Sequence, residues 1–314
     1  MVSGLKFRTK IFLIAVFLFS ALCTDVTWAT TYEEIQQEIN SMMDTTGKNF
    51  TTVTFNDGKN NVECNIFFPE NYSGKKKYPL VVFLSDGRTI GKETTAPLKN
   101  YGALIWATPE TQAKHECIVL VPQFPELLVD NKNYSVGKYF NVASNLIQAV
   151  AYGYSVDSSK IYLVGQSMGA MAAMLMAMQN PKFFAAEIFV SGQWDIRQLR
   201  NLSTQKFFNV VSEGDSRAYQ GQYQMMDMLK QLKIRYTFSD GWDAQMEDEG
   251  ITDAINTLLT GRAQANFISF RKGTVLPKTP GPNDTEHNCS FQYAFRFDAL
   301  REWLFRQSTG AKQR

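Results

Sequence analysis

The sequence is poor in the two residue types that most often build metal and redox sites. Its 314 residues include two histidines, His115 and His287, and four cysteines, none of which belongs to a Cys-x-x-Cys pair. Imidazole and thiolate ligands are too few for the usual zinc centre, and the cysteine spacing gives no redox motif. The sequence therefore predicts chemistry that needs no metal and no other cofactor.

An excess of charge of one sign is also missing. The formal net charge is +2 at pH 7, and no basic stripe with interleaved aromatic residues occurs, so we expect no nucleic-acid partner. After about residue 30 the chain contains no repeat, no low-complexity tract and no Pro/Ser-rich linker. With 44% hydrophobic residues it can bury one large core, which predicts one catalytic domain over residues 30–314.

The first 29 residues have the pattern of a secretory signal peptide. Lys6, Arg8 and Lys10 precede an apolar run over residues 11–23, and a small residue, Ala29, follows. The run is short for a membrane span, and no basic stop-transfer cluster follows it. We therefore expect export to a secreted or periplasmic location with cleavage near Ala29 and no stable membrane insertion afterwards. Cleavage would leave 29 basic and 29 acidic residues.

Cleavage would also remove one cysteine, Cys23, and leave Cys64, Cys117 and Cys289. An oxidising compartment could join two of these three, and their spacing does not say which two.

Strand and helix patterns alternate along the rest of the chain. Alternation predicts a mostly parallel sheet with helices on both faces, and the near-continuous apolar character of the later strands is that of strands covered on both sides. The first two strands look like an antiparallel N-terminal edge. Predicted strands cover residues 51–56, 62–69, 78–84, 117–122, 160–165, 185–192, 206–212, 234–239 and 266–270, and predicted helices cover 142–154, 170–179, 219–232, 251–259 and a closing helix over 291–306.

A serine stands between two glycines where a predicted strand meets a predicted helix. Gly165, Gln166, Ser167, Met168 and Gly169 fit the pattern Gly-x-Ser-x-Gly. A turn this tight strains the middle residue and leaves room only for hydrogen at the two glycines. It lifts the hydroxyl above the sheet edge near a helix N-terminus. The pattern predicts that Ser167 is a nucleophile.

A serine nucleophile needs a base, and the two histidines are the candidates. His287 lies in a polar segment, PGPNDTEHNCS, which we expect to be a loop between the last strand and the closing helix. His115 lies before a strand in the first half and is most simply a solvated loop residue. We predict His287, because the order nucleophile, acid, histidine accompanies this strand-turn-helix arrangement.

The acid that orients the histidine should leave another strand at the same sheet edge. Asp215 follows a hydrophobic strand and precedes a helix, and it is the predicted acid. Glu213, two residues earlier, is a fallback, and Asp240 and Asp243 after the next strand compete with it. Acidic residues after strands also serve as plain turn formers.

An oxyanion produced by attack on a carbonyl needs hydrogen-bond donors. The backbone N–H of Met168 at the helix start is one predicted donor, and that of Asp86 or Gly87, in the loop SDGRTIG after the strand over 78–84, is the other. The same loop sequence is also a good turn.

With these residues in this order, the chain resembles an α/β-hydrolase. It is most similar to the secreted esterase and predicted-peptidase group related to polyhydroxybutyrate depolymerases, feruloyl esterases and the prolyl oligopeptidase catalytic domain. The resemblance rests on PENYSGKKKYPLVVFL, ECIVLVPQF, SSKIYLVGQSMGA and EHNCSFQYAFRFDALREWLF, and it covers most of the chain after the signal segment. The group usually has a His-Gly pair after the first of these strands, where this chain has Ser85-Asp86-Gly87.

The resemblance implies a serine hydrolase that cleaves a carboxylic ester through an acyl-enzyme, on a small-molecule or polysaccharide-linked substrate such as an aryl or sugar ester. Peptidase activity of the prolyl oligopeptidase type is the nearest alternative, and a hydrolase-like protein that binds without turnover is another. Trp194 and Trp242 are predicted either to line the acyl or alcohol pocket or to pack in the core.

Overall fold

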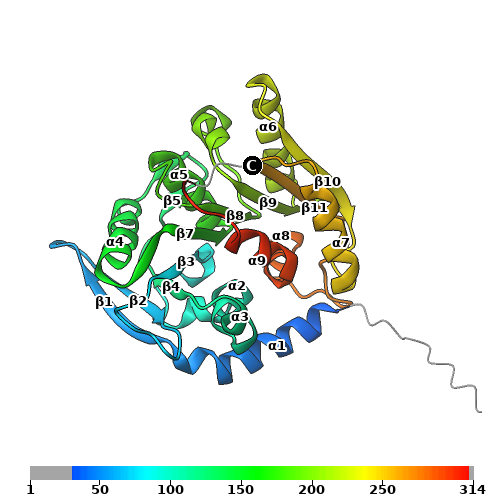
Figure 1. Ribbon diagram of the computed structural model, residues 1–314. Helices are drawn as coiled ribbons and strands as arrows, with labels where there is room; N and C mark the ends of the chain where they lie inside the picture. Colours follow the sequence, from blue (N-terminus) through cyan, green and yellow to red (C-terminus); the bar gives the residue numbers. More distant parts are fainter. Residues whose placement is uncertain (1–29, 311–314) are drawn as a thin grey trace, which may run out of the picture.

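A nine-stranded sheet forms the centre of the fold (Figure 1). The computed structural model describes residues 30–310. The strand order is β1-β2-β4-β3-β7-β8-β9-β11-β10, and β5 and β6 form a separate two-stranded hairpin. The strands are β1 (Thr51–Asn56), β2 (Asn61–Phe67), β3 (Tyr78–Leu84), β4 (Ile118–Gln123), β5 (Val129–Asp130), β6 (Ser135–Val136), β7 (Val156–Gln166), β8 (Ala186–Val190), β9 (Phe207–Ser212), β10 (Tyr236–Trp242) and β11 (Ala265–Phe270).

Most of the sheet is parallel. β1 pairs antiparallel with β2, and β2 pairs antiparallel with β4. The pairs from β4 through β3, β7, β8, β9 and β11 to β10 are all parallel. The predicted fold class, a mostly parallel sheet with an antiparallel N-terminal edge, is confirmed. Because parallel strands run in one direction, the loops that leave their carboxyl ends gather at one edge of the sheet.

Helices cover both faces of this sheet. They are α1 (Tyr32–Thr45), α2 (Tyr101–Leu104), α3 (Pro109–Lys114), α4 (Tyr139–Gly153), α5 (Met168–Gln179), α6 (Ser216–Gln231), α7 (Asp248–Leu259), α8 (Glu286–Arg296) and α9 (Asp298–Phe305). One buried cluster joins the sheet to α4, α5 and α6, and a second joins its other face to α1, α2, α7, α8 and α9.

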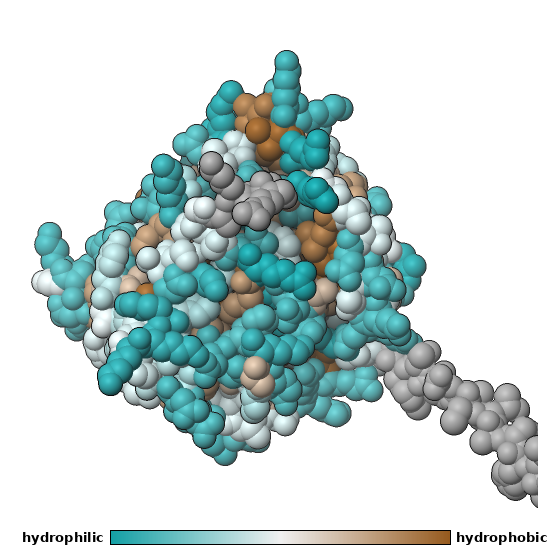
Figure 2. All heavy atoms as spheres, viewed as in Figure 1, coloured by the Kyte–Doolittle hydropathy of each residue, from teal (hydrophilic) through white to brown (hydrophobic). Residues whose placement is uncertain are grey.

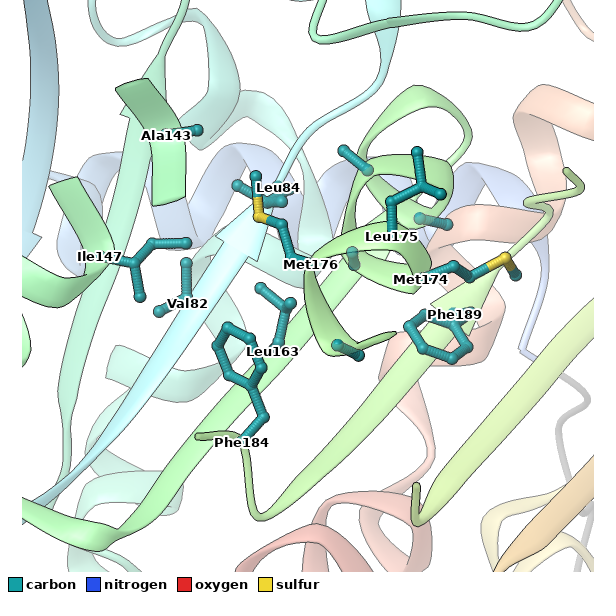
Figure 3. Packing of buried hydrophobic residues seen from close by; sticks show 14 of the residues in the cluster. Val82, Leu84, Ala143, Ile147, Leu163, Met174, Leu175, Met176, Phe184 and Phe189 are labelled. Carbon is teal, nitrogen blue, oxygen red and sulfur yellow. The ribbon is translucent and has the colours of Figure 1, made fainter. Parts of the chain in front are cut away.

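The side chains of β3 show how the two clusters divide. Val82 and Leu84 belong to the first, and Val81 and Phe83 belong to the second, as expected for a strand whose successive side chains point to opposite faces. Figure 3 shows Val82 and Leu84 with side chains of α4 and α5, including Met176. The methionine-rich α5 is buried almost throughout, so its methionines fill the core.

The closing helix differs from its prediction. Two helices, α8 and α9, stand in place of one, and α8 begins at Glu286, five residues earlier than expected. The break is at Phe297, whose backbone is extended. Its ring lies 5.7 Å from Phe270 and 6.3 Å from Trp242. These core contacts come from distant strands, so the local apolar period did not indicate the break.

The predicted signal segment, residues 1–29, lies outside the described residues. Among the helices of residues 30–310, none is long and apolar enough to cross a membrane. Figure 2 shows a face on which hydrophobic side chains occur in small groups between hydrophilic ones.

The three cysteines after the predicted signal segment, Cys64, Cys117 and Cys289, are free and buried. Burial is the main cause that raises the pKa of Cys64 and of Cys117 to about 12 and that of Cys289 to about 11. These thiols are therefore protonated at neutral pH and unsuited to act as nucleophiles.

Candidate active site

Ser167 lies in the tight turn between β7 and α5, with the geometry of a nucleophile elbow. Its φ is +50° and its ψ is −117°, a region that costs a non-glycine residue conformational energy. A Cβ atom on Gly165 would lie 2.6 Å from the carbonyl carbon of Gly169, and one on Gly169 would overlap the Leu84 carbonyl oxygen. Only glycine fits at both positions, as the sequence pattern predicted. The Ser167 N–H donates to the Val190 carbonyl at 2.9 Å and fixes the turn to β8.

The structure brings Ser167, His287 and Asp215 together, although they are far apart in the sequence. His287 Nε2 lies 2.8 Å from Ser167 Oγ, and His287 Nδ1 lies 2.5 Å from Asp215 Oδ2. An ionised carboxylate can only accept hydrogen bonds. Nδ1 therefore carries the proton and donates to Asp215, which leaves Nε2 to accept from the Ser167 hydroxyl. This arrangement suits transfer of the serine proton to histidine.

Secondary structure holds the two partners of Ser167 in place. Asp215 follows β9 and is the N-cap of α6, where its Oδ1 accepts from the Ala218 N–H at 3.2 Å. Its side chain is 7% exposed. The prediction that His287 lies in a loop is wrong, because it occupies the first turn of α8, capped by Thr285. The Phe291 ring, one turn further along α8, packs edge-on against the imidazole with centroids 5.1 Å apart.

The competing acids have other partners. Glu213 accepts from the backbone N–H groups of Gly241 and Lys272. Asp243 forms an ion pair with Arg271 at 2.5 Å. Asp240 lies in the exposed part of the edge strand β10. Of the four carboxylates considered, Asp215 is the one hydrogen-bonded to His287.

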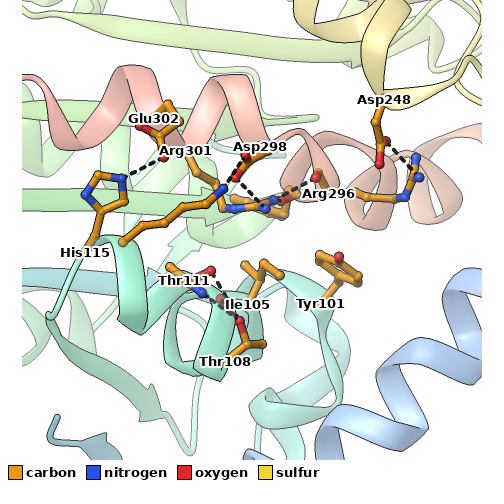
Figure 4. A network of polar contacts seen from close by, with 12 residues as sticks. Tyr101, Ile105, Thr108, Thr111, His115, Asp248, Arg296, Asp298, Arg301 and Glu302 are labelled. Carbon is orange, nitrogen blue, oxygen red and sulfur yellow. Dashed lines mark hydrogen bonds and ion pairs between the residues drawn. The ribbon is translucent and has the colours of Figure 1, made fainter.

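His115 is placed in a different part of the molecule. Its Nε2 lies 2.8 Å from Glu302 Oε1 of α9 (Figure 4). Its ring stacks on Phe305 with centroids 4.3 Å apart. His115 lies in the loop after α3, as expected, but its side chain is only 25% exposed and bridges α3 to α9 instead of extending into solvent.

A cavity of about 590 Å³ opens beside Ser167 and His287. Most of the residues that line it have polar or charged side chains, and none of the described lining residues is Phe, Tyr or Trp. The lining residues are Asn131, Ser167, Met171, Gln193, Gly214, Asp215, Ser216, Arg217, Ala218, Leu276, Asp284, Thr285, Glu286 and His287.

The predicted pocket tryptophans do not line this cavity. Trp194 is 3% exposed and donates from Nε1 to Gln198 at 3.0 Å. Trp242 is 5% exposed and donates to Ser239 at 2.7 Å. Both side chains pack in the core, which was the other expectation for them.

Glu286 is a site residue that the sequence reasoning missed. Its carboxylate accepts from the Ser212 hydroxyl and, at 2.7 Å, from the Gly273 N–H. It lies so close to Gly214 that a Cβ atom there would overlap it. Glu286 thus holds the start of α8 against the β9 loop that carries Asp215. Its position in the sequence directly before His287 is the signal that could have indicated it.

The predicted oxyanion donors lie close to the elbow. Met168 is the first residue of α5 and has no side-chain cap, so its N–H has no acceptor within the helix. The loop after β3 contacts the same turn, since a Cβ on Gly169 would also lie 2.7 Å from the Ser85 carbonyl oxygen. The N–H groups of Asp86 and Gly87 donate to no acceptor within residues 30–310.

This fold and this elbow define the class of α/β-hydrolases. The Esterase family model ("Putative esterase") matches residues 56–223, more than half of the chain, and the chain belongs to this family.

Relatives with known names are similar at low sequence identity. Acetylxylan esterase A of Emericella nidulans is 24% identical over 151 residues, which are 47% of this chain and 48% of that protein. The chain therefore matches about half the length of this curated relative.

Two solved esterases share the fold. The structure of a thermostable esterase superposes with a TM-score of 0.65 and 22% identity, over 83% of this chain and 64% of the other. A feruloyl esterase module from Clostridium thermocellum complexed with sinapinate gives a TM-score of 0.55 and 14% identity, over 84% of this chain and 90% of the module.

Proposed function

We propose that the protein is an exported serine hydrolase that cleaves carboxylic esters through an acyl-enzyme, with Ser167 as nucleophile, His287 as general base and Asp215 as the acid that orients the histidine. One observation carries the proposal: a hydrogen-bonded chain runs from Asp215 through His287 to a serine held in a strained turn beside a cavity. Membership of the Esterase family supports the ester as substrate.

The positions of the three side chains support the following reaction. Ser167 Oγ attacks the ester carbonyl while His287 Nε2 accepts its proton, and Asp215 stabilises the resulting imidazolium. The tetrahedral intermediate collapses when Nε2 returns the proton to the departing alcohol oxygen, which leaves the acyl group on Ser167. Water then attacks the acyl-enzyme with His287 again as base, the carboxylic acid leaves, and Ser167 regains its proton.

The negative charge on the intermediate needs donors that are already in place. The N–H of Met168 at the start of α5 and the N–H of Asp86 or Gly87 are the proposed donors. Removal of one such donor costs about 10²- to 10³-fold in kcat in a serine protease.

The composition of the cavity wall favours an alcohol rich in hydroxyl groups. The lining residues include the amides Asn131 and Gln193, the guanidinium of Arg217 and the carboxylate of Asp284. Such groups bond to sugar hydroxyls, whereas an aryl group would gain more from aromatic walls. We therefore propose a sugar ester, free or linked to a polysaccharide, and an aryl ester is the alternative. The similarity to an acetylxylan esterase agrees with this choice.

The experiment that tests the proposal labels the folded protein with a fluorophosphonate. We expect labelling of the wild type at Ser167 and none of Ser167→Ala, whose ester turnover should fall by about 10⁴-fold or more. Absence of labelling in well-folded wild type would contradict the proposal and favour binding without turnover.

A substrate comparison with the same preparation separates the remaining alternatives. Acetylated sugars, aryl esters of increasing acyl size and p-nitroanilide peptides would be compared by kcat/KM. Faster cleavage of the anilides than of any ester would indicate a peptidase instead.

A further inference from the structure

A buried carboxylate in the loop after β3 is bonded to the residue that precedes the nucleophile. Asp86 Oδ2 accepts from Gln166 Nε2 at 2.7 Å, and the same Gln166 nitrogen donates to Asn100 Oδ1 at 2.8 Å. Arg88 donates to the Asp86 carboxylate three times, from its backbone N–H and Nε at 2.8 Å each and from Nη2 at 3.1 Å. The side chain of Asp86 is 3% exposed.

This carboxylate is charged despite its burial. Burial raises the pKa of Asp86. The hydrogen bonds and charge of Arg88 and the bond from Gln166 together lower it by more than burial raises it, so the pKa lies below its ordinary value. A buried ion pair is weak evidence for stability, because desolvation offsets much of the attraction. Such a pair can instead select one conformation of the chain that carries it.

The loop around Asp86 has a conformation that matters for the proposed reaction. The Asp86 carbonyl accepts from Thr89 Oγ1 at 3.0 Å, and Thr89 Oγ1 lies 2.7 Å from Ser85 Oγ. These bonds close a short turn, and the N–H groups of Asp86 and Gly87 take no part in them. An anion binds well to N–H groups only when their direction is fixed before it forms.

The same network reaches the helix that carries the base. The Arg88 guanidinium lies over the Phe291 ring at 5.5 Å, and this ring packs against His287 at 5.1 Å. Arg88 thus lies between the loop after β3 and α8, while Gln166 joins the loop to the turn of Ser167.

We propose that the Asp86 side chain is a positioning residue that fixes the oxyanion loop against the Ser167 turn, through Gln166 on one side and Arg88 on the other. The inference rests on the proposed esterase function. It adds a residue whose carboxylate contacts no reacting atom and acts through the loop that it positions. Loss of the network changes the direction of the loop N–H groups, so it weakens binding of the tetrahedral intermediate more than binding of the ester.

The chain contains a matched control for this network. Asp195 and Arg197 form the same Asp-x-Arg turn, in which Asp195 Oδ1 accepts from Arg197 N at 3.0 Å and Nε at 2.9 Å, and Oδ2 accepts from Nη2 at 2.6 Å. Arg197 is 85% exposed. Within residues 30–310, Arg197 alone donates hydrogen bonds to the Asp195 carboxylate, whereas Asp86 also accepts one from Gln166.

The test compares Asp86→Asn with Asp195→Asn on an ester substrate and with a boronic acid inhibitor, whose tetrahedral adduct places an oxygen at the oxyanion position. Asparagine has one oxygen, so its NH₂ group would face the donors of Gln166 or Arg88. We expect kcat of Asp86→Asn to fall about 10- to 100-fold with KM changed less than about twofold. The boronate Ki should rise in parallel with the fall in kcat, and Asp195→Asn should match the wild type.

A second variant separates charge from geometry and serves if Asp86→Asn does not fold. Arg88→Lys keeps the positive charge at a side chain that is 49% exposed, but it loses the two-nitrogen contact. A positioning role predicts a fall in kcat in this variant too, with unchanged circular dichroism.

Several results would overturn the inference. One is a wild-type kcat in folded Asp86→Asn, or in Arg88→Lys if only that variant folds. Another is a loss of kcat in Asp195→Asn as large as that in Asp86→Asn. If the wild type neither turns over esters nor binds the boronate, the proposed function falls and the inference with it. That outcome is distinct from an active wild type whose kcat is insensitive to Asp86.

Discussion

His287 and His115 each hydrogen-bond a carboxylate and each contact a Phe ring. His287 bonds to Asp215 and meets Phe291 edge-on at 5.1 Å, and His115 bonds to Glu302 and stacks on Phe305 at 4.3 Å. The exposed fractions of the side chains are 33% and 25%. Burial, a carboxylate partner and an aromatic neighbour therefore do not separate the two.

What separates them is the second ring nitrogen. Nε2 of His287 faces the Ser167 hydroxyl at the wall of a cavity, whereas the Nε2 of His115 is itself the atom bonded to the carboxylate, Glu302. A histidine with one nitrogen bonded to an acid and the other to a hydroxyl can move a proton. A histidine whose single bond is to an acid on another helix joins the two helices. A His–carboxylate pair therefore indicates a catalytic site only when the second ring nitrogen of the histidine can accept a proton from a reactant.

The largest expected effect is that of His287→Ala. Without a base at Nε2 the Ser167 proton has no acceptor, so kcat for an ester should fall by about 10⁴- to 10⁶-fold, as for the histidine of serine proteases. His115→Ala should keep kcat within about twofold, since the side chain lies outside the cavity. Steady-state kinetics with matched protein concentrations check this pair. Equal losses in the two variants would end the distinction between the histidines.

A smaller effect is expected when the acid partner of each histidine becomes an amide. Asp215→Asn keeps one acceptor oxygen for the Ala218 N–H and turns its NH₂ group, a donor, toward Nδ1. The His287 proton then moves to Nε2, the wrong tautomer, so kcat should fall about 10⁴-fold with KM little changed. Glu302→Gln makes the same chemical change at His115 and should leave kcat unchanged. Asp243→Asn is a further control, because that carboxylate pairs with Arg271. Loss of activity in Asp243→Asn alone would show that the acid is misassigned.

The elbow was predictable because its signal is local. Five consecutive residues specify the turn, and the flanking apolar strand and small-residue helix are visible beside them. The order of Ser167, Asp215 and His287 is the one that accompanies this strand-turn-helix arrangement, and Asp215 was indicated because the carboxyl ends of parallel strands meet at one sheet edge. The parallel sheet and its antiparallel edge were predicted for the same reason: each strand has its own apolar run.

Local signals were also overlooked in two places. Thr31 caps α1 and Glu34 completes a capping box with it, yet no helix was predicted there. Thr285 also caps α8, with a bond from the Asn288 N–H at 3.1 Å, so a helix begins where the polar composition around His287 predicts a loop. These two N-caps are the local signals that indicate both helices.

The remaining features depend on pairs that are distant in the sequence. Gln166 meets Asp86 across 80 residues, and Phe297 breaks the closing helix because its ring packs on Phe270 and Trp242. No periodicity in a single segment encodes such contacts. Trp194 and Trp242 illustrate the same limit, since the residue type fits both a pocket wall and a core.

The smallest expected effect is on stability, and it belongs to His115. His115→Ala removes a hydrogen bond to Glu302 and a stacked contact with Phe305, which together should lower the free energy of unfolding by about 1–2 kcal/mol. For a chain of this size that corresponds to a fall in Tm of roughly 2–4 °C, measurable by circular dichroism or calorimetry. His287→Ala is the matched comparison, because it removes an imidazole from the proposed catalytic site, where function commonly costs stability. We expect it to change Tm less than His115→Ala while losing nearly all activity. A larger fall in Tm for His287→Ala would mean that His287 also stabilises the fold. The distinction between a catalytic and a structural histidine would then no longer hold.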